Sequence, residues 1–229
     1  MTTDPTSPQA PTSLTVAVLG ATGRTGRPLV EELLARGHRV RALVRDPARL
    51  GALADRVEVV TGSSEDPAAL AEVLTGADAV VSALGPAAKD ATLHRRTAEA
   101  LVRVMREQGP RRFVGISGAG IDVPGDAKAL PARVISSLMQ RFGGAVVEDK
   151  VAEHRIWADS GLDWTLVRPP RLTDGPATGV IEHDAHRSTR STRIRRTDLA
   201  RFLVDVLEQG LHVGLAPFAA GAKSGGARR

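Results

Sequence analysis

The stretch from Thr15 to Arg45 reads TVAVLGATGRTGRPLVEELLARGHRVRALVR and holds three glycines, Gly20, Gly23 and Gly26, at intervals of three residues. They lie between a run of small apolar residues and an amphipathic segment. A first glycine after a strand permits a tight turn, a second lets the backbone approach a pyrophosphate, and a third permits close packing of a helix on the strand. The pyrophosphate then meets free N–H groups at the positive end of the helix. The stretch therefore predicts a dinucleotide-binding turn, for which the alternative is an ordinary turn between a strand and a helix.

The composition indicates a globular protein and removes several kinds of chemistry. The chain has 229 residues, of which 42% are hydrophobic and 25% charged, and an α/β protein of this length commonly forms one domain. Cysteine is absent, which excludes disulfides, thiolate metal ligands and a thiol nucleophile. Aromatic residues make up only 3%, and tyrosine is absent as well.

The terminal residues favour a cytoplasmic protein, and the composition disfavours a nucleic-acid partner. The first residues, MTTDPTSPQAPTS, lack the basic and apolar regions of a signal peptide, and no apolar run approaches the roughly 18 residues of a membrane helix. Much of the net charge of +5 lies in the segment 186–196 and in the tail. Aromatic side chains that stack on nucleic-acid bases are nearly missing. We therefore expect neither a membrane nor a nucleic-acid partner, and the oligomeric state stays open.

Apolar runs rich in valine alternate with segments of helical periodicity. Such alternation predicts a parallel sheet with helices on both faces, and continuously apolar runs are typical of strands buried on both sides. The expected fold class is α/β, a single-domain, Rossmann-like, doubly wound parallel sheet. The expected strands are Thr15 to Leu19, Arg39 to Val44, Val57 to Thr61, Ala79 to Ala83, Arg112 to Ser117, Trp164 to Arg168 and a short one near Leu211 to Leu215. The expected helices are Arg24 to Arg36, Pro47 to Ala54, Asp66 to Leu74, Thr92 to Gln108, Val147 to Ser160 and, with Thr197 as its N-cap, Asp198 to Glu208.

The same pattern predicts the domain boundaries. Residues 1–13 and 221–229 are rich in small and polar residues and are expected to be a disordered leader and tail. Residues 14–220 are expected to form the NAD(P)-binding domain. Two insertions, 121–146 and 169–196, follow the fifth and sixth strands, so both emerge at the carboxyl edge of the sheet, where open α/β folds bind ligands.

The end of the second expected strand indicates which dinucleotide binds. An acidic residue there accepts hydrogen bonds from the ribose hydroxyls and disfavours a 2′-phosphate. This chain has Arg45 at that point and Arg49 one helical turn later, and guanidinium groups bind phosphate through a planar fork. The pattern favours NADP(H), with a solvated surface charge as the alternative reading of Arg45. Asp46 precedes Pro47 and is expected to cap a helix.

Further small and polar residues at the carboxyl edge are candidates for cofactor contacts. Small residues are needed where the backbone lies against a flat ligand, so SALG at 82–85 is expected near the nicotinamide ribose and Ser63 near the adenine. No histidine or carboxylate group has the spacing of a metal site, and no metal is expected. The candidate cofactor-binding residues are Gly20, Thr22, Gly23, Arg24, Thr25, Gly26, Arg45, Arg49, Ser63, Ala83, Leu84, Gly85, Ser117, Lys150 and Pro169.

The motifs VAVLGATGRTG, VRDPARL, VSALG, FVGISGAG and DKVAEHRIWADSGLDWTLVRPPRLTDGP together resemble the atypical short-chain dehydrogenase/reductases. Within them the chain is similar to the NAD(P)-binding NmrA-like group and the biliverdin reductase B/flavin reductase type, from about Thr15 to Glu208. The resemblance implies an NADPH-dependent reductase in which Ser117 has the position of the family's serine near the nicotinamide and Lys150 that of its helix lysine. In short-chain dehydrogenases this lysine follows a catalytic tyrosine by four residues, whereas Val146 has that position here.

The missing tyrosine restricts the acceptor. Reduction of a simple ketone needs a positioned proton donor, whereas a conjugated acceptor such as a flavin, a quinone or a linear tetrapyrrole spreads the incoming charge. Ser117, Lys150 and His154 are the candidate catalytic residues, because His154 lies one helical turn after Lys150 on the same face. A structural histidine and a surface lysine are the alternatives. Glu153 is expected either to pair with a cation or to solvate the helix, and Arg168 to brace the loop that follows it.

Three functions remain open at this point. The first is an NADPH-dependent reductase of a conjugated small molecule. The second is a non-catalytic NADP(H)-binding regulatory or interaction protein, as some NmrA-like proteins are thought to be. The third, isomerase or lyase chemistry with a tightly held cofactor, is disfavoured because tyrosine is absent. The two insertions carry few distinctive groups, so the substrate itself is not predicted.

Overall fold

The computed structural model of the chain describes residues 13–85, 90–130, 133, 134, 136, 137, 141 and 144–222. The expected leader, apart from Ser13, lies outside the described residues, as do 223–229 of the expected tail and parts of the first insertion. Pro86, which ends the SALGP motif, also lies outside them.

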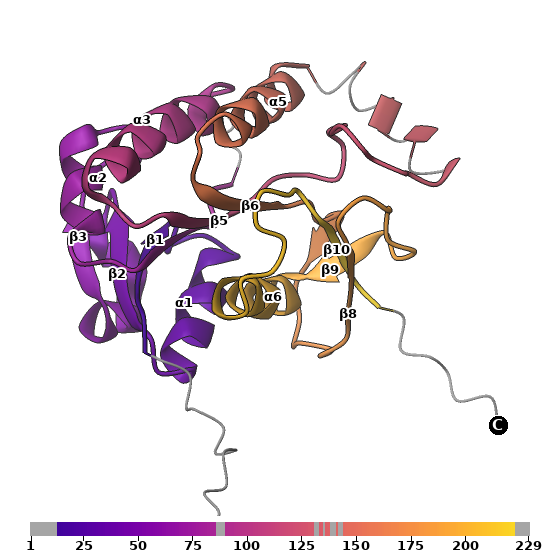
Figure 1. The fold of residues 1–229 in the computed structure, drawn as a ribbon. Helices are drawn as coiled ribbons and strands as arrows, with labels where there is room; N and C mark the ends of the chain where they lie inside the picture. Colours follow the sequence, from indigo (N-terminus) through magenta and orange to yellow (C-terminus); the bar gives the residue numbers. More distant parts are fainter. Residues whose placement is uncertain are drawn as a thin grey trace, which may run out of the picture.

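Six parallel strands form the central sheet (Figure 1). Their order is β3-β2-β1-β4-β5-β6, so the direction of winding reverses between β1 and β4. Val16 in the middle of this sheet pairs with Val40 on one side and Ala79 on the other. The predicted Rossmann-like, doubly wound fold is confirmed. The strands are β1 (Thr15–Leu19), β2 (Arg39–Val44), β3 (Glu58–Thr61), β4 (Ala79–Ser82), β5 (Arg112–Ile116) and β6 (Asp163–Val167).

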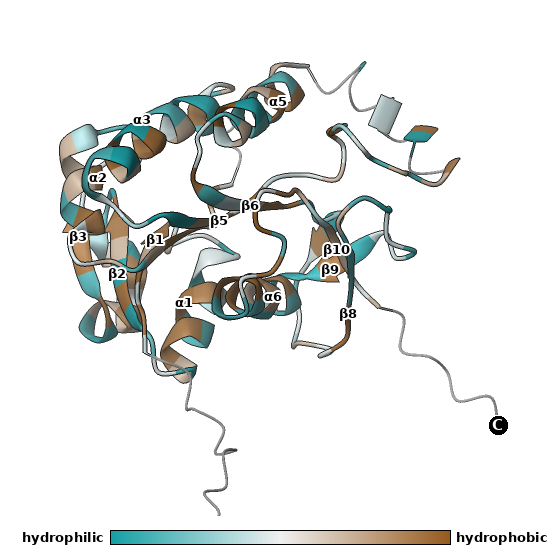
Figure 2. Ribbon diagram, in the orientation of Figure 1, coloured by the Kyte–Doolittle hydropathy of each residue, from teal (hydrophilic) through white to brown (hydrophobic). Residues whose placement is uncertain are grey.

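Helices cover both faces of the sheet, as the alternating pattern predicts. On one face α1 (Gly26–Ala35) packs against α6 (Arg196–Glu208), and on the other α2 (Pro67–Leu74) and α5 (Gly144–Ala158) flank α3 (Leu93–Gln108) (Figure 1). A 3₁₀ segment, η1 (Pro47–Arg56), links β2 to β3. In Figure 2 the central strands are mainly brown while the helices also carry teal residues, which agrees with strands buried on both sides.

Each face of the sheet has its own hydrophobic cluster. One joins Val16 and Val18 to Leu29, Leu33 and the apolar residues of α6. The other joins Ala17 and Leu19 to α2, α3 and Trp157 of α5. Alternate residues of β1 therefore enter opposite clusters, and burial of both sets stabilises a strand at the centre of the sheet.

The second insertion forms strands of its own at the carboxyl edge. β7 (Arg171–Thr173) pairs in parallel with β9 (Arg193–Arg195), and β8 (Ile181–Asp184) pairs antiparallel with β10 (Phe218–Gly221). The insertions also touch each other, because Ala127 N–H donates to the His186 carbonyl at 2.9 Å. The two insertions therefore support each other beyond the carboxyl ends of β5 and β6.

Two details near the C-terminus differ from expectation. The predicted strand near Leu211 to Leu215 is wrong: this segment makes only an isolated bridge from Leu215 to Thr165, and the last strand is β10, which reaches Gly221. The predicted N-cap Thr197 is also wrong, because α6 already begins at Arg196 and the Thr197 hydroxyl donates to the Gly175 carbonyl at 2.9 Å. Thr197 thus ties α6 to the second insertion.

Candidate active site

The glycine loop between β1 and α1 is closely packed. Gly20 has a φ of +78°, and its carbonyl accepts from Gly23 N–H at 2.9 Å. A Cβ at Gly20 would lie 2.9 Å from backbone atoms of Ala83 and Leu84, which follow β4. The Thr25 side chain makes no capping hydrogen bond. In the first turn Arg27 N–H donates to the Gly23 carbonyl at 3.0 Å, and Pro28 has no N–H. The positive end of the α1 dipole and the small loop residues nevertheless lie where the winding of the sheet reverses, a geometry suited to a diphosphate.

The end of β2 presents two exposed arginines beside this loop. Arg45 directly follows β2, and Arg49 lies in η1. Asp46 caps η1, since its carboxylate accepts from Ala48 N–H at 3.1 Å, which confirms its predicted capping role. Arg27 of α1 donates to the carbonyls of Arg49 and Leu50 and thereby fixes η1 against the glycine loop.

The remaining predicted cofactor contacts also lie at this edge. Ala83 N–H donates to the Leu19 carbonyl at 2.9 Å, which holds the exits of β4 and β1 together. The Pro169 carbonyl accepts from Ala119 N–H at 3.1 Å and joins the exits of β6 and β5 in the same way. The Ser63 hydroxyl is 3.4 Å from Glu65 N–H after β3. Thr22, Leu84 and Gly85 lie in the loops that follow β1 and β4.

Ser117 lies directly after β5 with an unused hydroxyl. Its N–H donates to the Val167 carbonyl at 2.8 Å, while its buried Oγ has no hydrogen-bond partner among the described residues. A buried hydroxyl without a partner is unfavourable. This position is therefore ready to hydrogen-bond a ligand.

Lys150 is held by three acceptors from three elements. Its ammonium lies 2.9 Å from His94 Nδ1 on α3, 3.0 Å from the Ile116 carbonyl on β5 and 2.9 Å from Glu153 Oε2 on α5. An ammonium has three N–H donors, so each donor of Lys150 already has an acceptor. Lys150 can therefore bind a hydroxyl of the cofactor only if one of these three hydrogen bonds breaks. The predicted pairing of Glu153 with a cation is confirmed.

His94 is the site residue that sequence reasoning missed. It lies in the first turn of α3, where Asp149 of α5 accepts from the N–H groups of His94 and Arg95, both at 3.0 Å. Burial, with a further contribution from the Lys150 charge, lowers the pKa of His94 to about 3. Its position within an amphipathic helix gave no sign of a contact with Lys150, which is 56 residues away.

His154 and Lys150 contact different residues, although they lie one turn apart on α5. Its ring packs edge-on against Trp164 of β6, with the ring centroids 5.4 Å apart, and burial lowers its pKa. Trp157 stacks on Phe113 at 3.7 Å and is buried. Both tryptophans therefore belong to the core.

Arg168 braces the first insertion, whereas the sequence predicted that it would brace the loop that follows it. Its fully buried guanidinium makes two bonds to Asp126, at 2.6 and 2.7 Å, and stacks on Phe218 at 3.8 Å. It also donates to the carbonyls of Ile121 and Ala216. One residue at the end of β6 thus holds the first insertion against the C-terminal segment.

The second insertion reaches the glycine loop through an ion pair. Arg24 donates to the Asp174 carboxylate, whose other oxygen accepts from Arg196 at 2.7 Å. Buried Asp198 fixes the same insertion by accepting from the N–H groups of Thr178 and Gly179. A carboxylate therefore lies between two guanidinium groups, beside the start of α1.

Comparison with known proteins identifies relatives of the whole fold. A family model described as NAD(P)H-binding matches residues 20–210. An uncharacterised chloroplastic protein of Arabidopsis thaliana is 33% identical over 195 residues, which are 80% of this chain and 68% of that protein. A solved structure of a candidate exported protein from Burkholderia pseudomallei is 31% identical, with a TM-score of 0.74, and the match covers 90% of this chain and 99% of that one.

A third similar structure is described as a candidate NADH-flavin reductase of Streptococcus pneumoniae. It is 25% identical with a TM-score of 0.75, and the match covers 92% of this chain and 100% of the other. Within the described ranges, no helix is long and apolar enough to cross a membrane. The expected cytoplasmic location stays a prediction, since one relative is chloroplastic and another is described as exported.

Proposed function

This chain belongs to the NAD(P)H-binding family, and we propose that it is an NADPH-dependent reductase that transfers hydride to a conjugated small molecule. The observation that carries the proposal is the glycine loop, where Gly20 and Gly26 bring the N-terminal end of α1 to the reversal point of the sheet. Diphosphates bind at such helix starts in doubly wound folds. The similarity to a candidate NADH-flavin reductase supports reductase chemistry.

Arg45 supports NADPH as the preferred form. Its guanidinium is exposed at the carboxyl end of β2, next to the glycine loop after β1. A 2′-phosphate on the adenosine ribose is a dianionic group that such a side chain binds with paired hydrogen bonds. Arg49 adds a second positive charge one turn later.

The chain's own residues would orient the reacting groups. When bound, the cofactor supplies the hydride. The unused Ser117 hydroxyl would donate to the nicotinamide carboxamide or to an oxygen of the acceptor. Lys150 would lie beside the same position, because its ammonium donates to the carbonyl of Ile116, the residue before Ser117. We propose a conjugated acceptor because the chain has no tyrosine to protonate an alkoxide.

One observation favours a non-catalytic NADP(H)-binding regulator as the second candidate. The three donors of Lys150 already have internal acceptors, so the lysine could serve only to stabilise the fold. A regulator would bind NADPH and turn over no acceptor. Oxidation of NADPH, followed by its absorbance with FMN, FAD, a quinone and biliverdin, separates the two functions.

Titration with NADPH and NADH tests the cofactor assignment. Wild type should prefer NADPH by more than about tenfold, or 1.4 kcal/mol, and Arg45→Ala should abolish most of that preference. Arg103→Ala, which removes an exposed arginine from α3, is the matched control and should retain it. An unchanged preference in Arg45→Ala would place the phosphate elsewhere, and absence of binding to either nucleotide would overturn the proposed function.

A further inference from the structure

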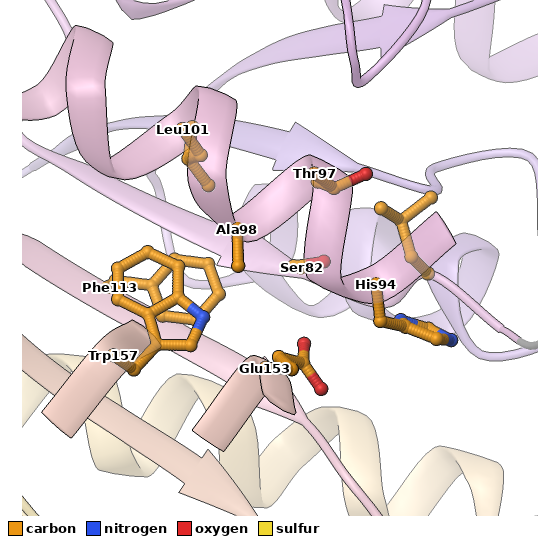
Figure 3. A pocket seen from close by; sticks show the side chains of 9 residues that line it. Ser82, His94, Thr97, Ala98, Leu101, Phe113, Glu153 and Trp157 are labelled. Carbon is orange, nitrogen blue, oxygen red and sulfur yellow. The ribbon is translucent and has the colours of Figure 1, made fainter. Parts of the chain in front are cut away.

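A small cavity lies between α3, α5, the end of β4 and Phe113 of β5 (Figure 3). Its volume of about 10 Å³ is close to the space that one water molecule needs. Polar groups of Ser82, His94, Thr97 and Glu153 line it together with apolar side chains. Figure 3 shows the Glu153 carboxylate directed from α5 toward the side of the cavity where His94 lies. The cavity is therefore polar enough to hold water.

Two buried nitrogen atoms around this cavity lack a hydrogen-bond partner among the described residues. They are His94 Nε2 and Trp157 Nε1. Because Lys150 donates to His94 Nδ1, the neutral imidazole carries its hydrogen on Nε2. A buried N–H without an acceptor is unfavourable by about 1–3 kcal/mol, and one water in the cavity would accept from it.

We propose that this cavity binds one ordered water beside His94 and that the water and Glu153 return protons to Lys150, which protonates the reduced acceptor. The inference rests on the proposed reductase function and names the proton source that the missing tyrosine leaves open. Lys150 is suited to this role because its ammonium donates to the carbonyl of Ile116, the residue before Ser117. Its side chain is 12% exposed, so it is not sealed inside the protein. Glu153 and His94 act through Lys150 and are positioning residues.

The proposed step balances in protons and electrons. The acceptor gains a hydride from the bound cofactor and becomes an anion. The Lys150 Nζ–H bond breaks, a new bond from hydrogen to the acceptor forms, and a neutral amine remains. The amine then regains a proton that has passed through the cavity water and Glu153. The overall stoichiometry is one NADPH and one solvent proton for each acceptor reduced by two electrons.

Two hydroxyl groups lead from the cavity to the loop after β3. Thr97 lines the cavity, and its Oγ1 lies 3.0 Å from Ser64 Oγ. Ser64 is half-buried in the loop after β3. Hydroxyls both donate and accept, so this pair can pass a proton from solvent to the cavity water.

The charges around Glu153 are suited to proton exchange. Lys150 and Asp149 face it from α5, and neutral His94 faces the same cluster from α3. Burial raises the pKa of Glu153, and Asp149 raises it further, while Lys150 acts in the opposite direction. The carboxyl group therefore accepts and releases a proton more readily than an exposed glutamate at neutral pH.

Steady-state reduction of FMN by NADPH tests the proposal. Glu153→Gln should lower kcat by at least tenfold, leave the NADPH dissociation constant within twofold and raise the solvent deuterium isotope effect. Imidazole buffer should restore part of the lost rate, which a purely structural role of Glu153 does not explain. Glu148→Gln, an exposed carboxylate on the same helix, is the matched control and should behave as wild type.

A second variant guards against misfolding of the first. Thr97→Val keeps the side-chain shape, leaves the Lys150–Glu153 ion pair intact and should lower kcat by about threefold or more. Normal turnover in wild type with unchanged kcat in both variants would overturn the inference alone. Wild type that binds NADPH but reduces none of FMN, FAD, quinone and biliverdin would overturn both the inference and the proposed function. A high-resolution structure without water in this cavity would also overturn the inference.

Discussion

A Cβ atom at Gly26 would lie 2.0 Å from the carbonyl oxygen of Gly20. Gly26 is the first residue of α1, and Gly20 is the first residue after β1. The helix therefore packs directly on the turn that precedes it, and no larger residue fits without moving one of the two backbones. This packing determines where the N-terminal end of α1 points.

Gly26→Ala should consequently lower both stability and cofactor affinity. Overpacking of a tight contact commonly costs about 1–3 kcal/mol, and a shifted α1 should weaken NADPH binding at least tenfold. Gly37→Ala is the control, because Gly37 has a φ of +83° but a Cβ added there would meet no atom within 4 Å. It should cost about 1 kcal/mol and leave binding unchanged. Equal affinities of Gly26→Ala and wild type, measured by fluorescence titration, would contradict this account of the loop.

The features that the sequence predicted are those that depend on neighbours in the chain. The glycine spacing, the apolar runs of β1 and β4, and the Asp46 cap all act within one turn or one strand. Buried strands and amphipathic helices follow from hydrophobic periodicity. The order of elements could therefore be predicted, as could the edge of the sheet where the ligand residues gather.

The contacts that could not be predicted join distant segments. His94 and Lys150 carry no local signal for each other, and their contact depends on how α3 packs beside α5. The strand expected near Leu211 to Leu215 failed for a similar reason. That segment bonds to the backbone of β6 at only isolated positions, while Phe218 to Gly221 finds a regular partner in β8. Tertiary pairing, rather than apolar content, decided which segment became a strand.

The buried pair of Arg168 and Asp126 should be essential for stability. Asp126→Asn leaves a fully buried guanidinium without its countercharge, and loss of one partner of a buried ion pair costs about 3–5 kcal/mol. Asp163→Asn, whose carboxylate makes an exposed pair with Arg111, should cost less than about 1 kcal/mol. Urea unfolding followed by circular dichroism measures both. Similar small losses in the two variants would mean that Arg168 relies on its carbonyl partners alone.

The carboxylate of Asp174 should oppose cofactor binding. It neutralises Arg24 in the glycine loop and adds a negative charge beside the start of α1. Asp174→Asn should therefore tighten NADPH binding by about two- to tenfold at low ionic strength, with a smaller effect at high salt. Asp159→Asn, an exposed carboxylate just after α5, is the control and should not change affinity. Weaker binding in Asp174→Asn would instead mean that the Arg24–Asp174 pair closes over the bound nucleotide.

The buried, neutral His94 should make the protein sensitive to mild acid. Its pKa in the folded protein is about 3, below the ordinary value of 6.5, so the unfolded chain binds a proton in this interval and the folded protein does not. Stability is therefore lost as pH falls from about 6.5 toward 3, by up to about 2 kcal/mol between pH 7 and pH 5. Burial lowers the pKa values of His154 and His212, which adds to this loss, whereas the raised pKa of Glu153 acts in the opposite direction.

His94→Asn isolates the contribution of this one side chain. The asparagine amide oxygen can accept from Lys150 as Nδ1 does, but the amide does not titrate, while His154, His212 and Glu153 remain in both proteins. The free energy of unfolding, measured in urea at pH 7 and pH 5, should therefore fall less in the variant than in wild type, by about 1–2 kcal/mol. Identical losses in the two proteins would show that His94 already takes up a proton in the folded state, and its assignment as a neutral donor to the cavity water would then fail with it.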